Sequence, residues 1–213
     1  MLLNQSYYKS ILCFFSLTLQ YTKLHMINLE DFFGSSSPLK AMLGGYQPRQ
    51  GQAKMAEEVA YAIKENQNLV IEAGTGIGKT FAYLVPALLS GQKIIISTGT
   101  KTLQDQLYHR DLPLISKAIG RPLSTALLKG RSNYLCLNRA KLATSNDKYI
   151  ARDLKLVNQW LHRTIVGDRS ELIDISETSS VWPLVTSTID NCLGRKCPEY
   201  NDCHVVKARK NAQ

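Results

Sequence analysis

Acidic side chains are few in this sequence. Its 213 residues include 17 aspartates and glutamates against 26 lysines and arginines, which gives a formal net charge of +9. An excess of positive charge favours a polyanionic partner, either a nucleic acid or a membrane surface. A basic protein without such a partner is the alternative that charge alone leaves open.

Long apolar runs and internal repeats are also missing. The most apolar stretch, SILCFFSLTL over residues 10–19, is too short to span a bilayer, and no small-x-small cleavage site follows it. We therefore expect no membrane anchor. We also expect residues 1–25 to be an extension outside the fold, with Met26 as the alternative start. An export signal is the competing interpretation of this stretch.

Cysteine is scarce and unevenly distributed. Of the five cysteines, Cys192, Cys197 and Cys203 lie within twelve residues, Cys136 precedes them by 55 intervening residues, and Cys13 lies apart. Four thiolates can hold a zinc ion or an iron–sulfur cluster. Zinc sites commonly use two close pairs of cysteines, whereas one lone cysteine and a C-x4-C-x5-C group favour a [4Fe–4S] cluster. Zinc and unrelated reduced thiols remain as alternatives.

Short apolar runs alternate with helical patterns in the first half of the chain. Helices are predicted over residues 49–65, 79–89 and 101–108, and strands over residues 68–72, 93–97 and 124–128. This alternation predicts an α/β fold with a parallel sheet covered by helices. After Lys129 the strand signals are few, and a helix is predicted over residues 152–163.

The segment AGTGIGKT connects the first predicted strand to the second predicted helix, which is the context of a Walker A phosphate loop. Its glycines allow backbone N–H groups to approach phosphate oxygens, and the helix adds its positive end. Lys79 can reach the β- and γ-phosphates, and Thr80 can ligate Mg²⁺. A glycine-rich turn with an incidental lysine is the alternative. The predicted nucleotide-binding residues are Ala73, Gly74, Thr75, Gly76, Ile77, Gly78, Lys79 and Thr80, of which Lys79 and Thr80 have the catalytic roles.

Two flanking segments indicate the type of nucleotide-binding protein. In YQPRQGQ, residues 46–52, Arg49 and Gln52 have a spacing that suits adenine recognition upstream of a helicase phosphate loop. In STGTKTLQDQL, residues 97–107, hydroxyls, a glycine and a lysine follow a predicted strand and could contact a nucleic-acid backbone. An ordinary helix cap at Thr100 is the alternative for the second segment.

These motifs together resemble the XPD-like superfamily 2 DNA helicases, and within them the bacterial DinG/YoaA group, the YoaA type in particular. The resemblance is also carried by LLKGRSNYLC at 127–136 and WPLVTSTIDNCLGRKCPEYNDCHVVKARK at 182–210, so it covers nearly all of the chain from Tyr46 onward. It implies that residues 26–128 are the first part of a RecA-like P-loop domain, which is the first motor domain of the helicase. Residues 129–213 would be an inserted, mainly helical iron–sulfur module.

The resemblance also implies a function. It implies an ATP-dependent 5′–3′ DNA helicase of the cytoplasm that acts in repair or replication, with ATP and Mg²⁺ at the phosphate loop. It assigns the [4Fe–4S] cluster to Cys136, Cys192, Cys197 and Cys203.

Basic and aromatic residues surround the cysteines and favour single-stranded DNA as the partner. Solvated lysines and core aromatics are the alternative. The residues in question are Lys129, Arg131, Arg139, Lys141, Arg195, Lys196, Lys207, Arg209 and Lys210, with Tyr134, Trp182 and Tyr200.

The 213 residues contain no Asp-Glu-x-His segment, so the Walker B carboxylates of the family are missing from them. The second motor domain that the resemblance implies, with its arginine finger, is missing as well. We therefore expect this chain to be the N-terminal part of a helicase, which binds nucleotide and DNA and has the C-terminal helicase segment as a partner. A non-hydrolysing binding module, or an inactive remnant of a truncated gene, is the alternative.

Overall fold

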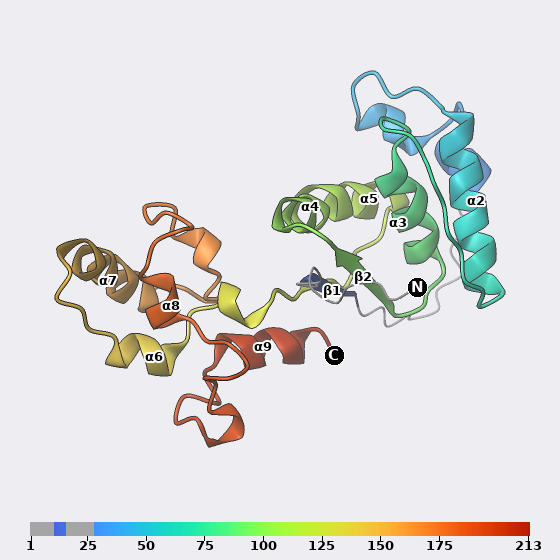
Figure 1. Cartoon of the computed structure of the whole chain (residues 1–213). Coiled ribbons are helices and arrows are strands. Elements are labelled where there is room, and N and C mark those ends of the chain that lie inside the picture. Colours follow the sequence, from blue (N-terminus) through green and yellow to red (C-terminus); the bar gives the residue numbers. More distant parts are fainter. Residues whose placement is uncertain (1–10, 16–27) are drawn as a thin grey trace, which may run out of the picture. The chain divides into compact units, whose positions relative to one another are not determined.

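The computed structural model of the protein describes residues 11–15 and 28–213, with side chains for residues 28–213 (Figure 1). The described residues form two compact units: residues 14–15 and 28–125 belong to one, and residues 11–13 and 126–213 belong to the other. A strand, β1 (Ile11–Phe15), lies within the stretch that we expected to be an extension. The remainder of residues 1–25 lies outside the described residues, so the assignment of that extension stays a prediction.

The unit that ends at Thr125 is built mainly from helices. They are α1 (Leu29–Phe33), α2 (Gln50–Lys64), α3 (Lys79–Leu89), α4 (Lys101–Gln106) and α5 (Leu112–Ile119), with a single π-helical turn at Leu107–Asp111 and one strand, β2 (Ile94–Thr98). Its core is apolar and fully buried, and it includes Phe32, Leu39, Leu84, Leu107 and Ile115. The helices α2 and α3 and the strand β2 lie where the apolar periodicity predicted them.

The helix predicted over residues 101–108 extends as a helical stretch to Ile119. Thr100 begins it, since its side chain accepts a hydrogen bond from the backbone N–H of Leu103. Pro113 does not end it, because this proline stands in the first turn of α5, where a missing N–H costs little. The helix cap that we left open as an alternative is therefore present.

The strand predicted over residues 68–72 is not formed. Leu69, Val70 and Ile71 are exposed, Val70 to 96%. Residues 68–72 make no backbone–backbone hydrogen bond with any residue that the structure describes. A buried strand needs neighbours that pair with its backbone and cover its side chains. The described part of the chain provides neither, so this apolar run stays uncovered. Of the other two predicted strands, residues 93–97 correspond to β2, and Ala126–Leu127 are the part of residues 124–128 that forms a strand.

The second unit, residues 126–213, is mainly helical, as predicted. It contains a two-residue strand β3 (Ala126–Leu127) and the helices α6 (Leu137–Leu142), α7 (Lys148–Leu161), α8 (Trp182–Val185) and α9 (His204–Asn211). Helix α7 begins four residues before its predicted start. The cause is Asp147, whose side chain accepts hydrogen bonds from the backbone N–H groups of Tyr149 and Ile150.

Residues 126–213 have an apolar core of their own. It is formed around α7 and α8 by buried side chains that include Leu154, Val157, Trp160, Trp182 and Val185. Trp182 is fixed there, since its indole N–H donates to the backbone carbonyl of Ser176. Within the described residues, no helix combines the length and apolar character that a membrane crossing would need.

The exposure of Val70 leads to a prediction about stability. The substitution Val70→Asp should change the unfolding free energy by no more than about 0.5 kcal/mol, because an exposed side chain loses little on replacement. Leu84→Ala, at a fully buried position of α3, should cost about 2–5 kcal/mol in the same urea titration. If Val70→Asp is as destabilising as Leu84→Ala, residues 68–72 are covered in solution.

Candidate functional site

The phosphate loop is held in shape by its glycines and by Lys79. Gly78, at the start of α3, has a φ of 87°, a left-handed conformation that favours glycine. The ammonium of Lys79 donates to the carbonyls of Ala73 and Gly74, both at 2.9 Å. The lysine therefore lies across the loop, at the N-terminal end of an eleven-residue helix whose dipole favours an anion.

Two side chains from the start of α2 bind the loop from outside. Arg49 Nη1 donates to the carbonyl of Gly76 at 2.5 Å, and Gln52 Nε2 donates to the carbonyl of Gly78 at 3.0 Å. Gln52 is buried, and a Cβ atom added to Gly78 would overlap its amide group. The structure thus brings both predicted adenine-binding residues to the phosphate loop, where they support its backbone.

The segment 97–107 shows mixed exposure. Thr98 and Gln104 are buried, and Thr100 caps α4, so these side chains serve the fold. Gly99 and Thr102 are exposed at the C-terminal end of β2 and in the first turn of α4. Contact between this segment and a nucleic acid stays a prediction.

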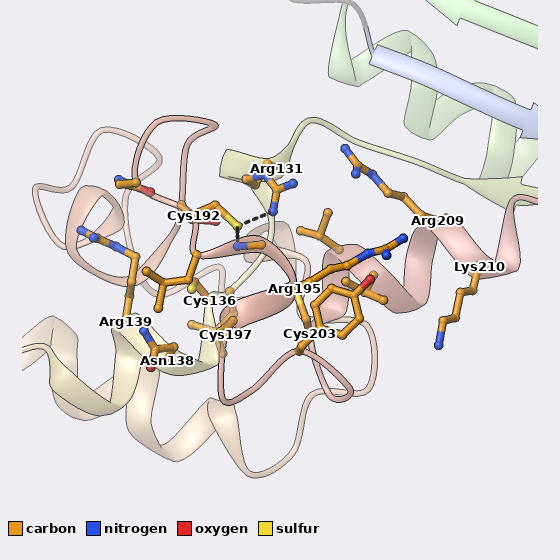
Figure 2. A pocket seen from close by; sticks show the side chains of 18 of the residues that line it. Arg131, Cys136, Asn138, Arg139, Cys192, Arg195, Cys197, Cys203, Arg209 and Lys210 are labelled. Atoms are coloured by element: carbon orange, nitrogen blue, oxygen red, sulfur yellow. Dashed lines mark hydrogen bonds between the residues drawn. The ribbon is translucent and has the colours of Figure 1, made fainter.

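Four cysteines line one pocket of about 450 Å³ in the second unit (Figure 2). Cys136 lies just before α6, Cys192 and Cys197 flank the short helical turn Gly194–Lys196, and Cys203 immediately precedes α9. All four are free and half-buried. The structure therefore brings the predicted ligands together from segments that are distant in sequence.

The thiols do not form a compact site for one ion. No three cysteine, histidine, aspartate or glutamate side chains of the described residues are placed to hold a metal ion. Tetrahedral zinc with Zn–S bonds of about 2.3 Å would place its sulfurs roughly 3.8 Å apart. Thiolates that bind different irons of a cluster can lie farther apart. The chemistry of the donor set fits a cluster, but the iron–sulfur module stays a prediction.

Polar groups surround the Cys192 sulfur. Arg131 Nη1 donates to it at 3.1 Å, and the backbone N–H of Gly194 donates at 3.4 Å (Figure 2). Burial raises the pKa of Cys136 above its ordinary value, and the nearby thiols of Cys197 and Cys203 raise it further. A metal that binds Cys136 must therefore displace its proton, which couples metal binding to pH.

The pocket is strongly basic. Besides the cysteines, its lining includes Arg131, Arg139, Arg195, Arg209, Lys210 and Tyr200. Figure 2 shows Arg209 and Lys210 projecting from α9 at one end of the pocket, away from the four cysteines. These cations were all among the residues that we predicted to contact DNA.

Other residues of the predicted DNA-binding set have structural roles. Lys129 is buried, and its ammonium lies 2.7 Å from the carboxylate of Asp168. Tyr134 and Trp182 are buried, so they cannot stack on bases. For Tyr134 and Trp182 the alternative of core aromatics was correct, because their rings contribute to the interior of the unit. For Lys129 the alternative of a solvated lysine was wrong, because its side chain is buried in the ion pair with Asp168.

Two exposed lysines of the set are paired with acids. Lys141 lies 2.7 Å from Glu199, and Lys207 lies 2.9 Å from Asp202. Both acids lie between Cys197 and Cys203. The sequence alone did not show which lysines they would pair with. The pairing partly neutralises these two cations.

Comparisons with known proteins identify the family of the chain. The profile of the DEAD/DEAH box helicase family matches residues 49–163. The chain is 52% identical over 188 residues to the ATP-dependent DNA helicase YoaA of Escherichia coli (strain K12), covering 86% of this chain and 30% of that protein. It is 37% identical over 196 residues to the ATP-dependent helicase DinG of Mycobacterium tuberculosis (strain ATCC 25618 / H37Rv), covering 79% and 29%.

The relatives differ in activity and are much longer than this chain. The 3′-5′ exonuclease DinG of Bacillus subtilis (strain 168) is 40% identical over 156 residues, which cover 70% of this chain and 17% of that protein. The chain thus spans less than a third of each of these relatives, and their names describe different whole-protein reactions.

The buried ion pair leads to a prediction. Lys129→Met should lower the unfolding free energy of residues 126–213 by about 3–5 kcal/mol, because it leaves Asp168 without its cation in a mostly buried place. Lys207→Met, which removes an exposed pair, should cost less than about 1 kcal/mol. Urea unfolding followed by tryptophan fluorescence measures both. Equal costs would show that the Lys129–Asp168 pair is solvated.

Proposed function

Since the chain belongs to the DEAD/DEAH box helicase family, we propose that it is the N-terminal part of the first motor domain of an ATP-dependent 5′–3′ DNA helicase of the DinG/YoaA group. Membership of the family implies a RecA-like P-loop fold. The observation that carries the proposal is the phosphate loop at the start of α3, supported by Arg49 and Gln52 and crossed by Lys79.

In the proposed mechanism the loop binds the triphosphate of ATP. Its backbone N–H groups and the positive end of α3 attract the phosphates, and Lys79 turns from the loop carbonyls toward the β- and γ-phosphates. Thr80 provides a hydroxyl for Mg²⁺. Arg49 and Gln52 hold the loop and bring their side chains to the adenine side of the site. An ATP-driven DNA motor of this kind would work in the cytoplasm.

The uncovered apolar run supports the proposal that this chain works with more helicase sequence. Two exposed residues of the run, Leu69 and Ile71, line an open groove of about 500 Å³. Its lining also includes Met55, Val59 and Ile94. Strands from the remainder of a motor domain, on the same or a separate chain, would cover this face. That remainder would also supply the carboxylates of the Walker B motif.

We predict that the 213-residue chain binds nucleotide but shows no DNA-stimulated ATP hydrolysis. Lys79→Ala should weaken binding of a fluorescent ATP analogue about tenfold or more, because a charge-assisted bond contributes about 1.5–3 kcal/mol. Lys54→Ala, at an exposed position of α2, is the control and should bind as the parent does. DNA-stimulated hydrolysis that disappears in Lys79→Ala would show that an acid of this chain replaces the missing pair.

We further propose single-stranded DNA as the partner of the basic pocket. Five cations line the pocket, and Tyr200 is the predicted aromatic residue that lies there with them. Cations that bind phosphates and a ring that stacks on a base are the combination that single strands require.

The DNA proposal predicts a dependence on salt. The logarithm of the binding constant should fall with the logarithm of salt concentration, with a slope of about −0.7 for each phosphate contacted. Replacing both Arg209 and Lys210 by alanine should make the slope less negative by roughly 1.4 if each contacts one phosphate. Lys207→Ala should change it less, because Lys207 is paired with Asp202. Fluorescence anisotropy at several salt concentrations measures the slopes, and a slope that does not respond to the double substitution contradicts the proposal.

The four cysteines are proposed to hold a [4Fe–4S] cluster. Arg131 and the backbone N–H of Gly194 would donate to the Cys192 thiolate, in the way that hydrogen bonds commonly support metal-bound sulfur. The bound cluster would supply covalent cross-links between the segments that carry Cys136, Cys192, Cys197 and Cys203. The basic side chains of the pocket would then be held in fixed positions.

Protein purified without oxygen should contain about four irons and four sulfides per chain. Cys197→Ser should lose the iron and the brown colour, while Cys13→Ser, which changes the cysteine outside the proposed set, should keep both. Elemental analysis and absorption spectroscopy are the measurements. One tightly bound zinc in place of iron would identify a structural zinc site, and absence of any metal would leave four reduced thiols.

A further inference from the structure

A glycine distant from the cysteines in sequence lies next to the backbone that carries Cys136. Gly167 accepts a hydrogen bond from the N–H of Leu135 at 2.8 Å, and its own N–H donates to Thr164 Oγ1 at 2.7 Å. Tyr134 and Asp168 form an antiparallel bridge beside this bond. The position of Gly167 is therefore fixed relative to Leu135, the residue that precedes Cys136.

The other side of Gly167 is covered by the side chain of His204. A Cβ atom added to Gly167 would overlap Cγ and Cδ2 of the imidazole ring and would lie 2.8 Å from its Nε2. His204 is buried and is the first residue of α9, directly after Cys203. Because residue 167 has no side chain, the imidazole of His204 lies directly against its backbone. This contact fixes how close the start of α9 lies to Gly167.

We propose that the contact between Gly167 and His204 is the spacer that sets the distance between Cys136 and Cys203. Leu135 and His204 are the immediate neighbours of these cysteines, and Gly167 contacts both. Gly167 and His204 are thus positioning residues for the metal ligands. This inference rests on the proposed metal-binding role of the pocket.

The spacer distinguishes Gly167 from other glycines with a left-handed backbone. Gly167 has a φ of 67° and Gly120 has a φ of 74°, so alanine is conformationally unfavourable at both positions. A Cβ atom at Gly120 would meet nothing within 4 Å, whereas one at Gly167 would meet the imidazole. Gly120→Ala therefore reproduces the backbone strain of Gly167→Ala without its steric overlap.

The first experiment measures tightly bound metal by elemental analysis. Gly167→Ala should lose most of the metal, because the added methyl group separates α9 from the segment that carries Cys136. The double variant Gly167→Ala/His204→Ala removes the ring and should recover most of the metal, and Gly120→Ala should retain the parent content. Full metal content in Gly167→Ala, or failure of the double variant to recover any, would overturn the spacer.

A second experiment applies if the parent protein contains no metal, in which case the pocket folds without one. Cys13, Cys192 and Cys197 are replaced by serine, so that Cys136 and Cys203 are the remaining thiols. Dibromobimane, which fluoresces strongly after bridging two thiols, then reports whether these two lie within reach of each other. Gly167→Ala should reduce the bridging rate several-fold, and Gly167→Ala/His204→Ala should restore it.

Together the two experiments test the proposed spacer independently of the proposed metal site. A metal-free parent whose bridging rate responds to Gly167→Ala refutes the proposed cluster and supports the spacer. A bridging rate that is the same with glycine and with alanine at position 167 overturns the spacer.

Discussion

The buried ion pair of Lys129 and Asp168 joins the segment before Cys136 to a segment about forty residues later in the chain. Its two charges lie 2.7 Å apart, and the backbone next to Asp168 is paired with Tyr134 and Leu135. Removing a charge from water is costly, so such a pair is retained only where the geometry is well defined. The pair and these backbone contacts therefore hold the segment that leads to Cys136 against the segment around Asp168.

The two candidate sites obtain their geometry by different means. The phosphate loop takes its shape from left-handed glycines and from side chains that bind its carbonyls, most directly Arg49 and Gln52. The cysteine pocket is assembled from segments that are far apart in sequence, around a core that contains Trp160 and Trp182. A local motif can be recognised by its residue order, whereas an assembled pocket depends on packing.

The solvent exposure of individual side chains changes how several residues are interpreted. Val70 lies in an apolar run that the described residues leave uncovered, and this exposure is the observation behind the proposal that further helicase sequence covers it. Lys129, Tyr134 and Trp182 show the opposite case, since residues that suit DNA binding by type serve the interior. The cations proposed to contact DNA line the pocket and include Arg195, Arg209 and Lys210. Lys196, which was also predicted to contact DNA, is exposed and is not part of the pocket lining.

The sequence by itself determined the local elements and the identity of the chemical groups. Apolar periodicity located α2 and α3, the order of glycines and Lys79 indicated the phosphate loop, and the resemblance of the motifs to a helicase family grouped Cys136 with the later three cysteines. These features depend on neighbours in the chain, so residue order is sufficient to predict them. Only the tertiary structure decided that Lys129 is buried, that Val70 is exposed and that Gly167 meets His204. Each of these depends on a partner distant in sequence, or on the lack of one among the described residues, and neither residue type nor local spacing specifies such a partner.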